Sequence, residues 1–171
     1  MSCSKFGALA ACMLLTGCGY HVAGHADLLP KNIKTIAVPA WSNVTAEYQL
    51  TDQIPEAISR EFISRTRYTV VADPKEADAV VKGAITNYFA YPIVTDQTSG
   101  RATGVEMMVT LQVYLYDRAG KELYSRPSFV LREQYEVAVN PQHYFDESPA
   151  ALARLSGDAA REIVSGILEK F

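Results

Sequence analysis

The alternation of apolar and polar residues is strongest between Val105 and Tyr116. The odd-numbered positions of this stretch are all apolar, and the even-numbered positions are amphiphilic. A period of two predicts a β-strand with one face on a core and the other face partly solvated. Residues 117–120 (DRAG) predict a hairpin turn. Residues 121–139 then predict a partner strand that is interrupted near Pro127.

Two other stretches have the three-to-four-residue spacing of amphipathic helices. The first contains Leu50, Ile54, Ile58 and Phe62 and predicts a helix at 51–66. Pro55 fits that helix only if it lies in the first turn. Ser148-Pro149 has the pattern of a helix start, and apolar residues recur from there to Ile167. The second helix is therefore predicted at 149–169.

Three less regular stretches, 33–38, 68–71 and 79–94, also predict strands, and residues 41–45 predict a loop. Each predicted helix has one apolar stripe, and the predicted sheet has one consistently apolar face. The simplest way to bury these surfaces is an α+β fold. We expect a two-layer sandwich with both helices packed on one face of a mixed, mostly antiparallel sheet.

The first 18 residues have the pattern of a processing signal. Lys5 precedes a ten-residue stretch (6–15) that is too short to anchor in a bilayer. Leu15-Thr16-Gly17-Cys18 then matches the lipobox of bacterial lipoproteins, which predicts cleavage after Gly17 and acylation of Cys18. The alternatives are a secretory signal in which Cys18 is incidental and a buried N-terminal helix. The expected organisation is a signal peptide (1–17), a lipidated tether (18–31) and one domain (32–171).

Composition and charge narrow the function classes. The chain has 171 residues and a net charge of −3, which argues against a nucleic-acid partner. No apolar run reaches the ~18–20 residues of a transmembrane helix. Cys3 and Cys12 lie in the signal segment, so the mature chain would keep only the acylated Cys18. This predicts neither a disulfide nor a thiolate metal site. Gly19, where an Asp often signals retention in the inner membrane, favours the outer membrane.

No group of residues in the sequence has the pattern of a catalytic site. His21 and His25 fall in the predicted tether, and we interpret them as solvated. Asp146-Glu147 is best explained as negative charge near the start of the last helix. A hydrolase would require His143 to lie against Ser148 or Asp146 in a cleft. We predict a protein that is not an enzyme and has no cofactor.

The partly solvated sheet face is the strongest candidate for binding. Tyr and Arg are enriched at protein interfaces. An ordinary solvated face explains the pattern equally well. The candidate residues are Met108, Tyr114 and Tyr116 on one strand and Tyr124, Arg126 and Arg132 on its predicted partner.

Four segments resemble the lipopolysaccharide-assembly lipoprotein family (LptE-like). They are Gly17 to His21, residues 29–39 (LPKNIKTIAVP), residues 65–71 (RTRYTVV) and residues 77–85 (ADAVVKGAI). The resemblance extends from Cys18 to the last helix. It implies two helices on a mixed sheet and attachment to the outer membrane on its periplasmic side.

The resemblance also implies partners. It implies a plug-like contact with the outer-membrane β-barrel protein that inserts lipopolysaccharide (LptD-like), and a direct contact with lipopolysaccharide. The candidates for contact with phosphate groups of lipopolysaccharide are Arg101, Lys121, Arg126 and Arg132. The main alternative is a periplasm-facing lipoprotein adaptor of another envelope complex.

Overall fold

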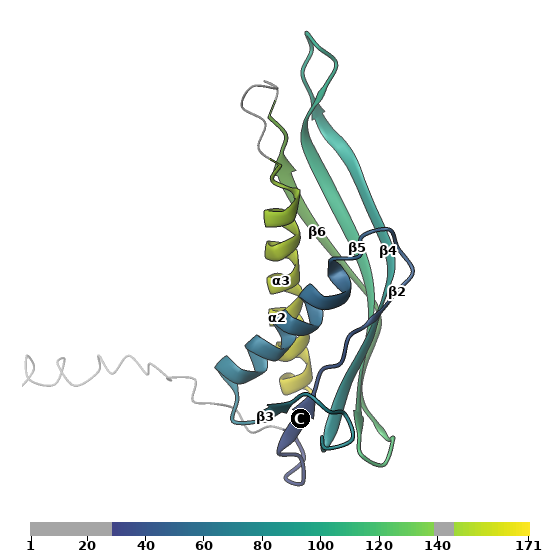
Figure 1. Cartoon of the computed structure of the whole chain (residues 1–171), viewed down its shortest axis with the longest axis vertical. Helices are drawn as coiled ribbons and strands as arrows, with labels where there is room; N and C mark the ends of the chain where they lie inside the picture. Colours follow the sequence, from purple (N-terminus) through teal and green to yellow (C-terminus); the bar gives the residue numbers. More distant parts are fainter. Residues whose placement is uncertain (1–28, 139–145) are drawn as a thin grey trace, which may run out of the picture.

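The computed structural model describes residues 29–138 and 146–171. In these residues the order of elements is β1 (Thr35–Ala37), β2 (Ser42–Asn43), α2 (Leu50–Arg65), β3 (Thr69–Val71), β4 (Ala79–Thr95), β5 (Ala102–Asp117), β6 (Glu122–Glu136) and α3 (Ser148–Glu169). The strands form one sheet in the order β3-β1-β4-β5-β6, with β2 paired to β4 at the side. The two helices lie together on one face of this sheet (Figure 1). The predicted two-layer α+β fold is confirmed.

The sheet is mixed. β1 runs parallel to β3 and to β4, and β2 runs parallel to β4, whereas the β4–β5 and β5–β6 pairs are antiparallel. The β4–β5 hairpin is long, and its far end extends beyond the helices (Figure 1). One face of this hairpin is therefore covered near its base and uncovered near its tip.

The core lies between the sheet and the helices. The odd-numbered residues of β5 from Met107 to Leu115 are fully buried, and the even-numbered residues are partly exposed, which confirms the predicted alternation. The predicted stripe of α2 (Leu50, Ile54, Ile58 and Phe62) is fully buried against this face. The buried side chains of β5 and α2 thus belong to one hydrophobic core. Each contributes about 1.5–3 kcal/mol on full burial.

The start of α2 differs from the prediction. The helix begins at Leu50, so Pro55 lies in its second turn and not in the first. Proline has no amide hydrogen and leaves the carbonyl four residues earlier, that of Thr51, without its helical donor. The backbone N–H of Trp41 donates to this carbonyl at 3.5 Å. The segment predicted as a loop at 41–45 therefore supports the helix, and it contains the short strand β2.

β6 continues through Pro127. Leu111 pairs with Phe129 and Val113 pairs with Arg126, so two β6 residues lie opposite Gln112 alone. This extra residue is a β-bulge, and β6 is an edge strand, two settings in which a sheet accepts proline. The predicted interruption is thus a bulge within one continuous strand.

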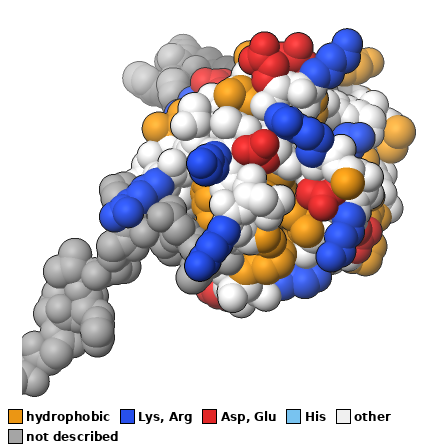
Figure 2. Space-filling model, turned by 90° about the horizontal axis from the view of Figure 1, so that it is seen from below, with side chains coloured by type: hydrophobic (Ala, Val, Ile, Leu, Met, Phe, Trp, Pro, Cys, Tyr) orange, Lys and Arg blue, Asp and Glu red, His pale blue; other side chains and the backbone are white. Residues whose placement is uncertain are grey.

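Neither described helix is long and apolar enough to cross a bilayer. Cys18, His21, His25 and His143 lie outside the described residues, as do the signal peptide and most of the tether. Figure 2 views the molecule from the end at which the β5–β6 turn lies. Lys and Arg side chains are spread over this end, with Asp and Glu side chains between them.

Candidate partner-binding face

The face of β4, β5 and β6 that points away from the helices is called the open face here. It carries the even-numbered β5 residues, which are partly exposed. The register sets their neighbours across the sheet. Met108 lies between Phe89 and Arg132, and Glu106 lies between Tyr91 and Gln134. Because no other described element covers these rows, their side chains are available to a partner.

Three apolar side chains of the open face form a patch. Phe89 is 52% exposed and lies directly opposite Met108, and Val130 is 47% exposed and lies diagonal to Met108. Side chains in such positions are close enough to touch. We call this surface the Phe89 patch (Phe89, Met108 and Val130). Large apolar residues grouped on an exposed face mark interaction sites more often than scattered ones do.

A polar row borders the Phe89 patch. The Tyr91 hydroxyl donates a hydrogen bond to Glu106, and the Gln134 amide donates to the other oxygen of that carboxylate at 3.0 Å. The hydrogen bond from Tyr91 is the main reason that the pKa of Glu106 lies below its ordinary value, and it raises the pKa of Tyr91. Glu106 is therefore ionised, and the row ties three strands together beside the apolar surface.

The structure places four of the predicted site residues on the open face. Met108, Tyr114 and Tyr116 are partly exposed there, and Arg132 is exposed beside Met108. The Tyr114 and Tyr116 rings stack with their centroids 6.1 Å apart. The three β5 residues keep the orientation that the period of β5 predicted.

Tyr124 and Arg126 are corrections. Tyr124 pairs with Leu115, faces the core and is 8% exposed beneath α3. Arg126 also points to the helix side, with its guanidinium 3.6 Å from the centre of the Phe129 ring and 3.4 Å from the Glu162 carboxylate. The bulge at Pro127 reverses which face the residues before it occupy, so neither side chain joins the open face.

The candidate cations do not gather. Arg101 is exposed in the β4–β5 turn, and Lys121 lies in the β5–β6 turn at the opposite end of the sheet. With Arg126 turned to the helices, Arg132 is the candidate that lies beside the Phe89 patch.

Sequence reasoning did not identify Phe89, Tyr91 or Val130. In β4 the residues after Asn87 are apolar without interruption (YFAYPIV), so the sequence does not separate the side chains of one face from those of the other. A register shift between Ile85 and Asn87 leaves Thr86 without an opposite residue. The orientation of Phe89 and Tyr91 could not be counted from the start of the strand across this bulge.

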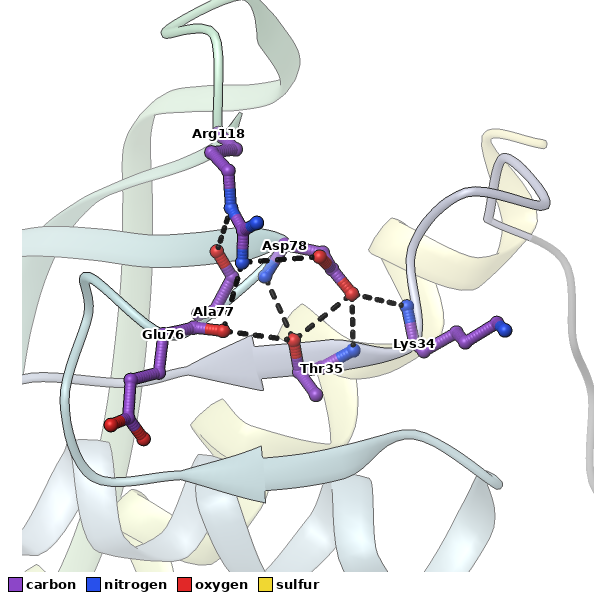
Figure 3. A network of polar contacts seen from close by, with 6 residues as sticks. All are labelled: Lys34, Thr35, Glu76, Ala77, Asp78 and Arg118. Carbon is purple, nitrogen blue, oxygen red and sulfur yellow. Dashed lines mark hydrogen bonds and ion pairs between the residues drawn. The ribbon is translucent and has the colours of Figure 1, made fainter.

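Asp78, from the segment that carried the family resemblance, has a structural role (Figure 3). Its Oδ2 accepts hydrogen bonds from the backbone N–H of Lys34 (3.0 Å), the backbone N–H of Thr35 (3.1 Å) and the Thr35 hydroxyl (3.0 Å). The Arg118 guanidinium lies 3.4 Å from its other oxygen. These bonds, led by that from Lys34, hold the pKa of Asp78 below its ordinary value. The carboxylate thus joins β1, the start of β4 and the β5–β6 turn.

Gly83, from the same segment, makes room for Trp41. A Cβ atom on Gly83 would lie 2.4–2.5 Å from three atoms of the Trp41 ring. Asp78 and Gly83, the two residues of this segment described above, therefore both have structural roles.

Comparison with known proteins agrees with this architecture. The LptE family model, described as Lipopolysaccharide-assembly, matches residues 33–167. The chain belongs to the LptE family. Membership assigns this family member to lipopolysaccharide assembly, in a family of lipoproteins that are generally not catalytic. No curated protein matches the chain.

Solved structures share the fold of this LptE family member. An uncharacterized lipoprotein B from Nitrosomonas europaea is 18% identical, with a TM-score of 0.58 over 88% of this chain and 96% of its own. The rare lipoprotein B from Shewanella oneidensis is 14% identical, with a TM-score of 0.50 over 79% and 94%. PelC from Paraburkholderia phytofirmans, solved as a dodecamer, is 13% identical, with a TM-score of 0.53 over 85% and 92%.

Within the described residues, no three His, Cys, Asp or Glu side chains come together as ligands for a metal ion. Hydrogen bonds from the Ser148 side chain and from the Ser148 backbone N–H, the latter at 3.0 Å, lower the pKa of Asp146 and support the first turn of α3.

Proposed function

We propose that the protein is a non-catalytic outer-membrane lipoprotein that fits inside the β-barrel protein that inserts lipopolysaccharide and helps to assemble it. Acylated Cys18 anchors it on the periplasmic side of the membrane. The open face contacts the barrel. The Phe89 patch is the single observation that carries this proposal, because it exposes apolar surface on the side of a long sheet that the helices do not cover.

The size of the patch sets the expected effect. Phe89 and Val130 each leave about half of their surface exposed. Since full burial of such side chains contributes about 1.5–3 kcal/mol each, covering both would contribute roughly 2 kcal/mol to binding. The flanking Tyr91, Glu106 and Arg132 supply the polar rim that protein interfaces need. The patch is thus suited to anchor a contact, and the rim to orient it.

Copurification from detergent-solubilised outer membrane tests the partnership. We expect a tagged protein to recover a large β-barrel protein, and Val130→Asp to reduce that recovery about tenfold or more. The matched control is Ile63→Asp. Ile63 is 61% exposed on α2, on the helix side of the molecule, so its substitution should leave recovery unchanged.

Two results would overturn the proposal. One is recovery of the protein without any large β-barrel protein, which would favour an adaptor of another envelope complex. The other is an equal loss of recovery in Val130→Asp and Ile63→Asp, which would mean that the open face has no special role.

We further propose that Arg132 contacts a phosphate group of lipopolysaccharide. Arg132 is exposed beside Met108 on the open face, and a guanidinium can pair with phosphate through two hydrogen bonds. In this arrangement the Phe89 patch and the cation lie next to each other, as an amphiphile with a phosphorylated headgroup requires.

A further inference from the structure

A groove at the end of the molecule opposite the β4–β5 tip contains cations that the proposed function does not use. It has a volume of about 600 Å³ and lies between the loop before β4 and the β5–β6 turn. The cations that line it are Lys75, Lys82 and Arg118. The carboxylate in its lining is that of Asp117. In a chain of net charge −3, this local excess of positive charge is unusual.

The two lysines have no counter-ion in the described part of the chain. The Lys82 ammonium lies 5.6 Å from the centre of the Tyr116 ring, and neither it nor the Lys75 ammonium forms an ion pair there. Lys82 extends from the open face of β4 in the row of Tyr114. Two ammonium groups that share one groove without a carboxylate partner provide a ready site for an anion.

The third cation is held in position. The Arg118 Nε donates to the Ala77 carbonyl at 3.2 Å, and Nη2 donates to the Glu76 carbonyl at 3.0 Å (Figure 3). Arg118 also pairs with Oδ1 of Asp78 at 3.4 Å, and Asp78 is itself held by three hydrogen bonds from Lys34 and Thr35 to its Oδ2. An anion that enters the groove would therefore meet a guanidinium whose orientation is fixed before binding.

The nearby carboxylate is also engaged. Asp117 Oδ1 accepts a hydrogen bond from the backbone N–H of Lys121 at 2.9 Å. Asp117 is thereby committed to the β5–β6 turn. Pro74, Ala77 and Val80 form the apolar part of the groove wall. The groove thus combines ammonium and guanidinium donors with an apolar wall.

We propose that this groove binds the phosphate group of a phosphate ester, and that the side chains of Lys75, Lys82 and Arg118 contact the phosphate. Arg and Lys are the side chains that proteins use to bind phosphate. The apolar wall takes the carbon side of the ester. Lys82 and Tyr116 belong to the open face but lie away from the Phe89 patch, and the lipoprotein binds the phosphate without the barrel protein.

The test uses the full-length lipoprotein in a neutral detergent, with backbone amide signals followed by two-dimensional NMR. One arm adds glycerol 3-phosphate, a soluble part of a phospholipid headgroup. The other arm adds inorganic phosphate. We expect the amides of Lys82 and Tyr116 to shift in a saturable way. Tighter binding of glycerol 3-phosphate assigns the site to a headgroup, and equal or tighter binding of inorganic phosphate assigns it to the free anion.

Variants locate the site. A hydrogen bond to a charged group is worth about 1.5–3 kcal/mol, so Lys82→Met should weaken binding about tenfold or more. Lys75→Met gives an independent test from a different element. Arg60→Met removes the same charge from the exposed surface of α2 and should leave binding unchanged. The proposal is overturned if the groove amides do not shift, or if Arg60→Met weakens binding as much as Lys82→Met.

Discussion

The contact between Gly83 and Trp41 gives the sharpest stability prediction. In Gly83→Ala the new Cβ would lie 2.4 Å from Trp41 Cδ2 and 2.5 Å from Cε2 and Cε3. Carbon atoms in contact normally lie about 3.5–4.0 Å apart, so the ring or the strand must move by about 1 Å. Trp41 is 3% exposed, and its ring is part of the core. The ring therefore has no free space into which it can retreat.

Overpacking of this kind costs about 1–3 kcal/mol. For a domain of this size, 1 kcal/mol corresponds to roughly 3 °C in Tm. We expect Gly83→Ala to lower Tm by about 3–9 °C in thermal unfolding followed by circular dichroism. A shift of the denaturation midpoint in urea, with an unchanged slope, should accompany it.

A matched glycine gives the opposite sign. A Cβ on Gly157 of α3 would meet the Arg161 side chain at 3.6 Å, an ordinary contact. Gly157→Ala should stabilise the helix by roughly 0.5–1 kcal/mol. A second check is Trp41→Leu, in which Gly83→Ala should cost less than it does beside Trp41. A Gly83→Ala protein as stable as the wild type would refute the argument.

Three further predictions concern other parts of the chain. The pKa of Asp78 is lowered in the folded state, so its hydrogen bonds stabilise the fold above its ordinary pKa of about 3.9 and are lost as the pH falls through the folded value. Tm should therefore fall less steeply below about pH 4 in Asp78→Asn than in the wild type, and parallel curves would contradict this. Cys18→Ser should move the protein from the membrane fraction to the soluble fraction of fractionated cells, and unchanged membrane attachment would exclude acylation as the anchor. Arg132→Glu should reduce crosslinking to a photoreactive lipopolysaccharide several-fold, with Arg60→Glu on α2 as the control, and unchanged crosslinking would remove Arg132 from the binding site.

The predictable parts of the fold are those with a regular local pattern. The period of β5 gave both its faces correctly, and the stripe of α2 gave the helix and its buried side. In both elements many residues follow one hydrophobic period. The position of a residue along the chain therefore predicts which face of the element its side chain occupies.

The mistakes occur where one extra residue enters a strand. Counting by twos from Arg132 places Tyr124 and Arg126 on the open face, whereas the bulge at Pro127 turns both toward the helices. The bulge at Thr86 hides the outward orientation of Phe89 in the same way. A bulge leaves only a weak local signal, because its position depends on how the partner strand pairs.

The sequence by itself determined the α+β class, the length and burial of the central strands and helices, and the lipobox at Cys18. These features depend on residue type and spacing along the chain. The tertiary structure decided which side chains share the open face, why Gly83 must lack a Cβ, and how Asp78 and Arg118 join distant segments. Those features depend on strand register and on contacts between residues more than 30 positions apart, and hydrophobic periodicity carries no information about either.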